Sequence, residues 1–197
     1  CLSGWNPDPL YKMYQWIADN AEAKKMKLVM GVGDITDKNE DAEYVLAKEQ
    51  FEKLAAAGIL YTITPGNHDM ASGKYEKYNK YFVGYGTEGE DGYIPALNSL
   101  LQNVSGYYGP IVNGVRTEDK TQVANYYVKT EIEGEKYIVF SFEYGAPDDI
   151  LAWAGEICDA NKDYKVIITT HAYMYRDGTT LDAGDCYPPS YYSGYTN

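Results

Sequence analysis

The sequence predicts an α/β fold with parallel strands, and two observations lead to that prediction. Short apolar runs at 27–33 and 59–64 have the length and composition of buried parallel strands, and each ends in a polar turn. Between them, residues 40–57 carry apolar side chains at helical spacing. Strand, helix and strand in this order form a βαβ unit, which places both strands parallel in one sheet.

The other elements are predicted in the same way, from apolar runs for strands and from helical spacing of apolar residues for helices. A first helix is expected over 8–25, where Pro9 suits the opening turn, and Asn39 is expected to cap the helix over 40–57. The remaining predicted elements are helices over 72–82, near 93–102 and over 147–161, a hairpin of strands 124–132 and 136–142, and a further buried strand over 165–170.

Length and charge place the chain among ordinary globular domains. Its 197 residues suffice for a single domain, 1–197, and its 17 Lys and Arg against 29 Asp and Glu give a net charge of −12. This acidity disfavours stable binding to a nucleic-acid backbone. The sequence has no apolar run of membrane-spanning length and no signal-peptide pattern, so we expect neither a membrane span nor a targeting segment in it.

Two residue types stand out by their numbers. The chain has 22 tyrosines and only two histidines, His68 and His171. Its three cysteines (Cys1, Cys158 and Cys186) form no metal-binding pair, and we expect one or more of them to be small buried side chains.

Polar residues follow three of the predicted strands. Asp34 follows the first strand, Asn67 and His68 follow the second, and His171 follows the last. In open α/β sheets such strand ends meet at one edge, so we expect these side chains to converge. Taken singly, Asp34 and Asn67 are explained by turns, and His171 is explained as a structural histidine. Both histidines of the chain fall at strand ends, however, and this coincidence favours a common site. Together the residues form a ligand set for a divalent ion such as Mn, Fe or Zn.

These residues belong to longer motifs that resemble a known family. GDITD (33–37), GNHD (66–69) and TTHAY (169–173), each after a strand, are similar to motifs of the calcineurin-like metallophosphoesterases, and SFEYG (141–145) extends the resemblance over most of the chain. The resemblance implies an α/β sandwich of two mixed β-sheets flanked by helices. It also implies hydrolysis of a phosphate mono- or diester at a dinuclear metal site.

The resemblance assigns a role to each residue of the motifs. Asp34 would bridge two divalent ions, and Asn67 and His171 would bind the second ion. His68 would lie near the phosphate, where it would stabilise developing charge or protonate the leaving oxygen, and Asp69 would orient the His68 imidazole. Bound cations would dominate the local field, so an acidic protein can still bind a phosphoester substrate.

Neighbouring residues complete the expected site. Asp37 is expected to order its loop rather than to bind metal. Tyr173 and Tyr175 follow His171 closely and are expected to line the substrate cleft, and Arg176 is a candidate contact to the phosphate, although a surface position is the alternative.

The motif pattern departs from the family at both ends. The family's first motif, Asp-x-His or Asp-x-Gln after an opening strand, and its final Gly-His motifs are absent. One ion would keep only Asp34, and the other would keep Asp34, Asn67 and His171, so we expect one ion or none here. We interpret the sequence as an excerpt of a longer polypeptide, incomplete at both ends and with unpaired strand edges. A naturally degenerate relative is the other interpretation.

A rival interpretation starts from the tyrosines, which gather at 75–108 and 173–195. Exposed rings stack on sugars and on protein partners, so the alternative function is a catalytically degenerate extracellular module that binds carbohydrate or protein. Half-buried rings that anchor loops are the plainer explanation. The Tyr-, Gly- and Asn-rich loops suit a secreted or cell-surface protein.

Overall fold

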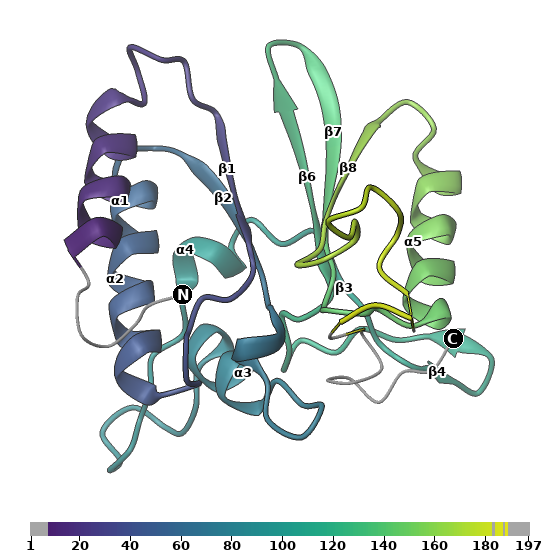
Figure 1. Ribbon diagram of the computed structural model, residues 1–197, viewed down its shortest axis with the longest axis horizontal. Coiled ribbons are helices and arrows are strands. Elements are labelled where there is room, and N and C mark those ends of the chain that lie inside the picture. The colour runs from purple at the N-terminus through teal and green to yellow at the C-terminus, as the bar shows by residue number, and fades with distance from the viewer. Residues whose placement is uncertain (1–7, 183, 187, 189–197) are drawn as a thin grey trace.

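Two β-sheets pack against each other, and helices cover their outer faces (Figure 1). The computed structural model describes residues 8–182, 184–186 and 188. Helices α1 (Asp8–Asn20) and α2 (Asp41–Ala56) cover a parallel pair of strands, β1 (Leu28–Val32) and β2 (Leu60–Thr64). Helix α5 (Asp148–Ala160) covers the other sheet. The α/β class with flanking helices is therefore confirmed.

The second sheet has four strands in the order β3-β6-β7-β8 and is mixed. Its β3–β6 and β6–β7 pairs are antiparallel, and β7 and β8 run parallel. The strands are β3 (Gly106–Tyr107), β6 (Tyr126–Ile132), β7 (Glu135–Ser141) and β8 (Lys165–Thr169). The smaller elements are η1 (Asn67–Asp69), α3 (Glu76–Val83), α4 (Asn98–Leu101), β4 (Ile111–Val112) and β5 (Val115–Arg116).

The start of α2 differs from the prediction, because Asn39 is not its cap. Asn39 has a left-handed backbone (φ 57°), and its side chain accepts a hydrogen bond from the Tyr44 hydroxyl (2.7 Å). Glu43 instead accepts the N–H of Glu40 (3.0 Å), which is the reciprocal half of a capping box. The first helix also ends earlier than predicted, at Asn20.

Strands β1 and β8 are less buried than their apolar sequences predict. Met30 and Val32 on β1 are 38% and 58% exposed, and Val166 and Ile168 on β8 are 44% and 59% exposed. Within the described residues, β1 pairs only with β2 and β8 only with β7, so each has one free edge. The prediction of buried strands is wrong here because a long apolar run alone does not distinguish an edge strand from a central one.

Many tyrosines form the core instead of exposed surfaces. Tyr75, Tyr78 and Tyr81, from the predicted tyrosine-rich segment, are all buried. Tyr44 stacks on Tyr81, with ring centroids 5.1 Å apart. These rings are tolerated inside because their hydroxyls find partners, as when Tyr44 donates to the carbonyl of Asp69 (3.2 Å). These three rings therefore do not supply the surface that a sugar-binding module needs, whereas Tyr85 and Tyr93 in the same segment are exposed.

The two cysteines that the structure describes differ in their exposure. Cys158, on α5, is partly buried and packs against the apolar cluster around Trp153, whereas Cys186 is exposed. Cys1 lies outside the described residues. A bilayer-spanning helix is not found in the part of the chain that the structure describes.

A buried polar layer joins the two sheets. The Tyr126 hydroxyl on β6 accepts the N–H of Ile63 on β2 (2.8 Å) and donates to its carbonyl (3.0 Å). Ser141 on β7 donates to the same carbonyl (2.6 Å), and the Thr64 hydroxyl donates to that of Thr169 on β8 (3.1 Å). These side chains satisfy backbone groups on the edge of β2 that no strand covers in the described structure.

We predict that Tyr126→Phe lowers the free energy of unfolding by about 1–3 kcal/mol, because the buried Ile63 N–H loses its partner. Urea denaturation measures this change. Tyr85→Phe is the matched control, since the Tyr85 side chain is 61% exposed, and its effect should stay within about 0.5 kcal/mol. Equal stability of Tyr126→Phe and the wild type would contradict the proposed junction.

Candidate active site

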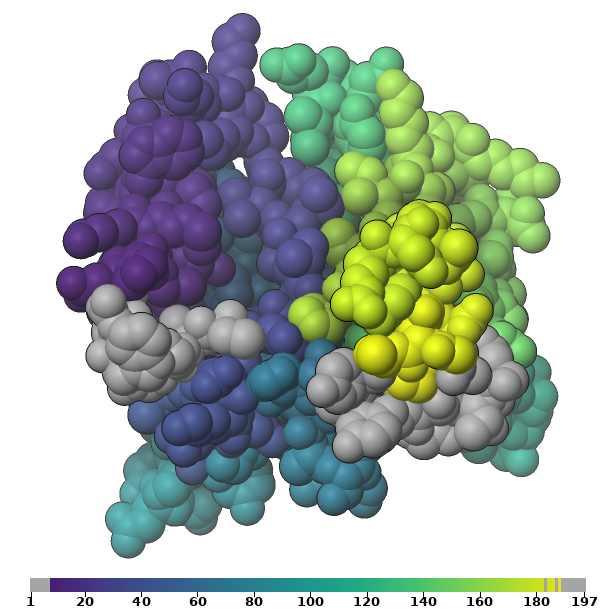
Figure 2. Space-filling view, in the orientation of Figure 1, coloured from purple at the N-terminus to yellow at the C-terminus, as the bar shows by residue number. Residues whose placement is uncertain are grey.

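The polar residues predicted from three strand ends meet at one pocket. Asn67 and His68 follow β2, His171 follows β8, and all three line a pocket of about 510 Å³. Asp34, which follows β1, lies beside both histidines. The other lining residues are Tyr144, Ala172, Met174, Tyr175, Leu181 and Cys186. The segment over 172–182, coloured yellow, stands out on one face of the molecule (Figure 2).

Two glycines allow the strand ends to approach so closely. A Cβ atom on Gly66 would overlap the carboxylate and backbone of Asp34, and one on Gly33 would overlap the imidazole of His171. Asp34 itself has a left-handed backbone (φ 49°), which few non-glycine residues adopt. The Gly-Asp and Gly-Asn pairs in the sequence are thus steric requirements of the site.

Asp34 and His171 form the closest pair of potential metal ligands. The Asp34 Oδ1 lies 3.3 Å from the His171 Nε2, and the His171 Nδ1 lies 2.8 Å from the carbonyl oxygen of Val32. The carbonyl can only accept, so Nδ1 carries a proton and Nε2 is the atom directed at the carboxylate.

The pKa values of this pair move in opposite directions. For His171, burial lowers the pKa, but hydrogen bonds to Asp34 and to the Val32 carbonyl outweigh burial and leave the pKa raised. For Asp34, burial raises the pKa, but hydrogen bonds from His171 and the His68 N–H leave it lowered. The negative carboxylate and the positive imidazolium therefore stabilise each other.

His68 is oriented by Asp37 rather than by Asp69. Its Nδ1 lies 2.6 Å from the backbone oxygen of Asp37, and its Nε2 lies 4.0 Å from the Asp34 Oδ2. The His68 side chain is 41% exposed, so its ring reaches the open part of the pocket. The His68 backbone N–H donates to the Asp34 Oδ1 (3.1 Å), which fixes the carboxylate.

Asp69 does not contact the His68 imidazole, and the prediction that it orients this ring is corrected. Its buried carboxylate accepts the N–H groups of Ile35 (3.0 Å), Thr36 (2.8 Å) and Gly66 (2.8 Å). Burial raises the pKa of Asp69, although these hydrogen bonds oppose the rise. Asp69 therefore ties the loop after β1 to the loop after β2.

Glu43 holds the Asp37 loop and was not predicted from the sequence. Its carboxylate accepts the N–H groups of Asp37 (2.9 Å), Lys38 (3.1 Å) and Glu40 (3.0 Å). The spacing of Glu40 and Glu43 at a helix start is the signal that could have identified it. The expected loop-ordering role thus belongs to the Glu43 side chain, and Asp37 contributes its carbonyl to His68.

The two predicted substrate residues do not line the pocket. Tyr173 is 66% exposed, and the guanidinium of Arg176 lies over the Tyr175 ring, 5.3 Å from its centroid. Tyr175 does line the pocket, together with Met174. No Lys or Arg lies among the described lining residues, so they supply no fixed cation for a phosphate.

The donor set suits one divalent ion. Metal–ligand bonds of about 2.0–2.2 Å place two ligands roughly 3 Å apart, and the Asp34–His171 separation of 3.3 Å agrees with that. Asn67 lines the same pocket and can add an amide oxygen. Among the described residues, no group of three His, Cys, Asp or Glu side chains is placed to hold an ion, so the candidate ligands here are two such side chains, Asp34 and His171, with the Asn67 amide.

We predict that Asp69→Asn lowers the free energy of unfolding by about 2–4 kcal/mol, because an amide NH₂ group would face backbone donors in a buried place. The measurement is urea denaturation without added metal. Asp37→Asn is the control, since its side chain is 30% exposed and its carboxylate lies no closer than 4.0 Å to the His68 Nδ1, and its change should be small. A stable Asp69→Asn protein would show that the loops do not depend on this carboxylate.

Comparison with known proteins agrees with this geometry. Curated proteins give no match to the chain. A family model described as "Calcineurin-like phosphoesterase" matches residues 4–194, which is nearly the whole chain. Members of this family generally use divalent metals, and the family points to a phosphoester hydrolase. The chain therefore belongs to the calcineurin-like phosphoesterase family.

Proposed function

We propose that the chain hydrolyses a phosphate mono- or diester with the help of one divalent ion, Mn, Fe or Zn, held by Asp34, Asn67 and His171. The observation that carries this proposal is the pairing of the Asp34 Oδ1 with the His171 Nε2 at 3.3 Å, with the His171 Nδ1 occupied by the Val32 carbonyl. In this tautomer the His171 Nε2 is the nitrogen available to bind a metal ion, and it points toward the Asp34 carboxylate.

A bound divalent ion supplies positive charge that polarises the phosphoester and lowers the pKa of water. The protein's own contribution is orientation. His68 is held by the Asp37 carbonyl through its Nδ1–H, so its Nε2, which lies 4.0 Å from the Asp34 Oδ2, donates a proton to a leaving oxygen when the imidazole carries both protons. Because the described lining has no Lys or Arg, the substrate charge is balanced by the ion and the imidazoles.

The first test is metal binding. We expect Asp34→Asn and His171→Gln to weaken the affinity for Mn²⁺ by at least about 10-fold, as measured by isothermal titration calorimetry. Asp163→Asn is the matched control, because that carboxylate pairs with Lys136 on the surface and should leave the affinity unchanged. If both site variants bind Mn²⁺ as the wild type does, the proposed ligands are wrong.

The second test separates catalysis from metal binding. We expect His68→Gln to lower kcat for p-nitrophenyl phosphate and bis-p-nitrophenyl phosphate by about 10²–10⁴-fold, because the leaving oxygen loses its proton donor. The Mn²⁺ affinity of the same variant should stay within a few-fold of the wild type. Unchanged hydrolysis by His68→Gln would remove His68 from the mechanism, and absence of Mn²⁺-dependent hydrolysis by the wild type would overturn the proposed function.

A further inference from the structure

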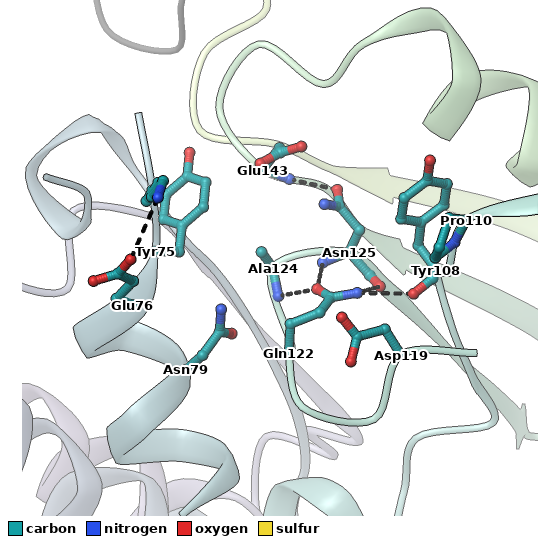
Figure 3. Close-up of a pocket in the computed structure, with 12 residues that line it drawn as sticks. Tyr75, Glu76, Asn79, Tyr108, Pro110, Asp119, Gln122, Ala124, Asn125 and Glu143 are labelled. Atoms are coloured by element: carbon teal, nitrogen blue, oxygen red, sulfur yellow. Dashed lines mark hydrogen bonds and ion pairs between the residues drawn. The ribbon is translucent and has the colours of Figure 1, made fainter. Parts of the chain in front are cut away.

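A second pocket, of about 350 Å³, opens between the start of α3 and the loop that precedes β6 (Figure 3). Tyr75 and Asn79 form one wall, and Gln122 and Asn125 form the opposite wall. The pocket shares no lining residue with the candidate active site. Its volume lies in the range of small-molecule sites.

Hydrogen bonds to the backbone hold these walls in place. Asn79 accepts the N–H of Val123 (2.9 Å), which ties α3 to the opposite loop. Gln122 accepts the N–H of Asn125 (3.0 Å), and Asn125 in turn accepts the N–H of Glu143 (3.0 Å). The amide oxygens are therefore already used, and the pocket is formed before any ligand enters.

Two carboxylates, Glu143 and Asp119, line this pocket, and in the described part of the chain neither forms an ion pair. The Asp119 Oδ1 accepts the N–H (2.9 Å) and the hydroxyl (2.5 Å) of Thr121, so hydrogen bonds alone offset its charge. Lys74 also lines the pocket, but its ammonium lies at the rim and pairs with Glu76 (3.7 Å), with both side chains more than two thirds exposed.

The Glu143 carboxylate is half-buried, and its pKa is raised. Burial raises its pKa, a hydrogen bond from Asn125 lowers it, and the charge of Asp149 raises it again. A half-buried carboxylate beside a second negative charge is costly, and a cation placed in the pocket would relieve both effects.

The rest of the lining suits carbon atoms rather than a bare metal ion. The buried ring of Tyr75 and the ring of Tyr108 lie in the lining with Pro110 and Ala124. Aromatic faces attract organic cations through their electron-rich surface. The Tyr108 ring already carries the Arg116 guanidinium, 5.7 Å from its centroid, so Tyr75 is the ring that a bound cation would meet. By contrast, no group of three His, Cys, Asp or Glu side chains in the described parts of the chain is arranged for a metal.

From these contacts we propose that the pocket binds a small organic ammonium ion. The carboxylates of Glu143 and Asp119 accept its N–H groups, and the Tyr75 ring packs on its carbon skeleton. The bound molecule occupies a site separate from the phosphoester pocket, so its binding requires neither a divalent ion nor catalysis.

The test compares an amine with its neutral analogue on the full chain without metal. Phenethylamine and 2-phenylethanol have nearly the same shape, and isothermal titration calorimetry measures the affinity of each. We expect phenethylamine to bind at least 10-fold more tightly. Glu143→Gln should weaken amine binding by at least 10-fold, and Asp119→Asn, on an exposed loop, should weaken it by a few-fold.

Glu76→Gln is the matched control, because it removes a carboxylate from the rim of the same pocket and should change the affinity by less than 2-fold. Circular dichroism checks that each variant is folded, and if Glu143→Gln is not, Asp119→Asn alone decides. The proposal is overturned if the alcohol binds as tightly as the amine. It is also overturned if glucose or Ca²⁺ binds while the amine does not, or if the variants that lack a pocket carboxylate bind like the wild type.

Discussion

The hydroxyl of Tyr126 is the contact on which the arrangement of both sheets depends. It pairs with the N–H and the carbonyl of Ile63, so a single side chain from one sheet satisfies the backbone edge of the other. Asp34 belongs to the sheet of β1 and β2, whereas His171 follows β8 in the other sheet. Buried hydroxyls hold the two sheets together, and across this junction the carboxylate and the imidazole meet at 3.3 Å.

Local patterns predicted most of the elements but not their environment. The βαβ unit, the hairpin and α5 follow from periodicity and turn residues, which act within a few neighbours. The exposure of Val32 and Ile168 could not be predicted, because it depends on which strands lie beside β1 and β8. The complete burial of Tyr126 could not be predicted for the same reason: a buried hydroxyl needs a partner, and the partner of Tyr126 is 63 residues away in the chain.

The sequence predicts that the candidate site residues converge, but it does not predict the contacts among them. Strand ends brought Asp34, His68 and His171 to one place, as the sequence motifs and the α/β topology indicated. The roles of Asp69 and Glu43 could not be predicted, because each carboxylate binds backbone N–H groups of loops, and no motif specifies the path of those loops. The Arg176 prediction rested on proximity in sequence to His171, and in the structure its guanidinium instead lies over Tyr175.

The tyrosine core makes the fold sensitive to alkali. Burial raises the pKa of Tyr14 to about 12, and it raises the pKa of Tyr126 further. An unfolded chain ionises its tyrosines near pH 10, so each buried hydroxyl stabilises the fold fully below that pH and loses its contribution as the pH rises beyond it. Ionised Tyr126 has no proton to donate to the Ile63 carbonyl. Strong base therefore separates the two sheets, and unfolding is coupled to proton release.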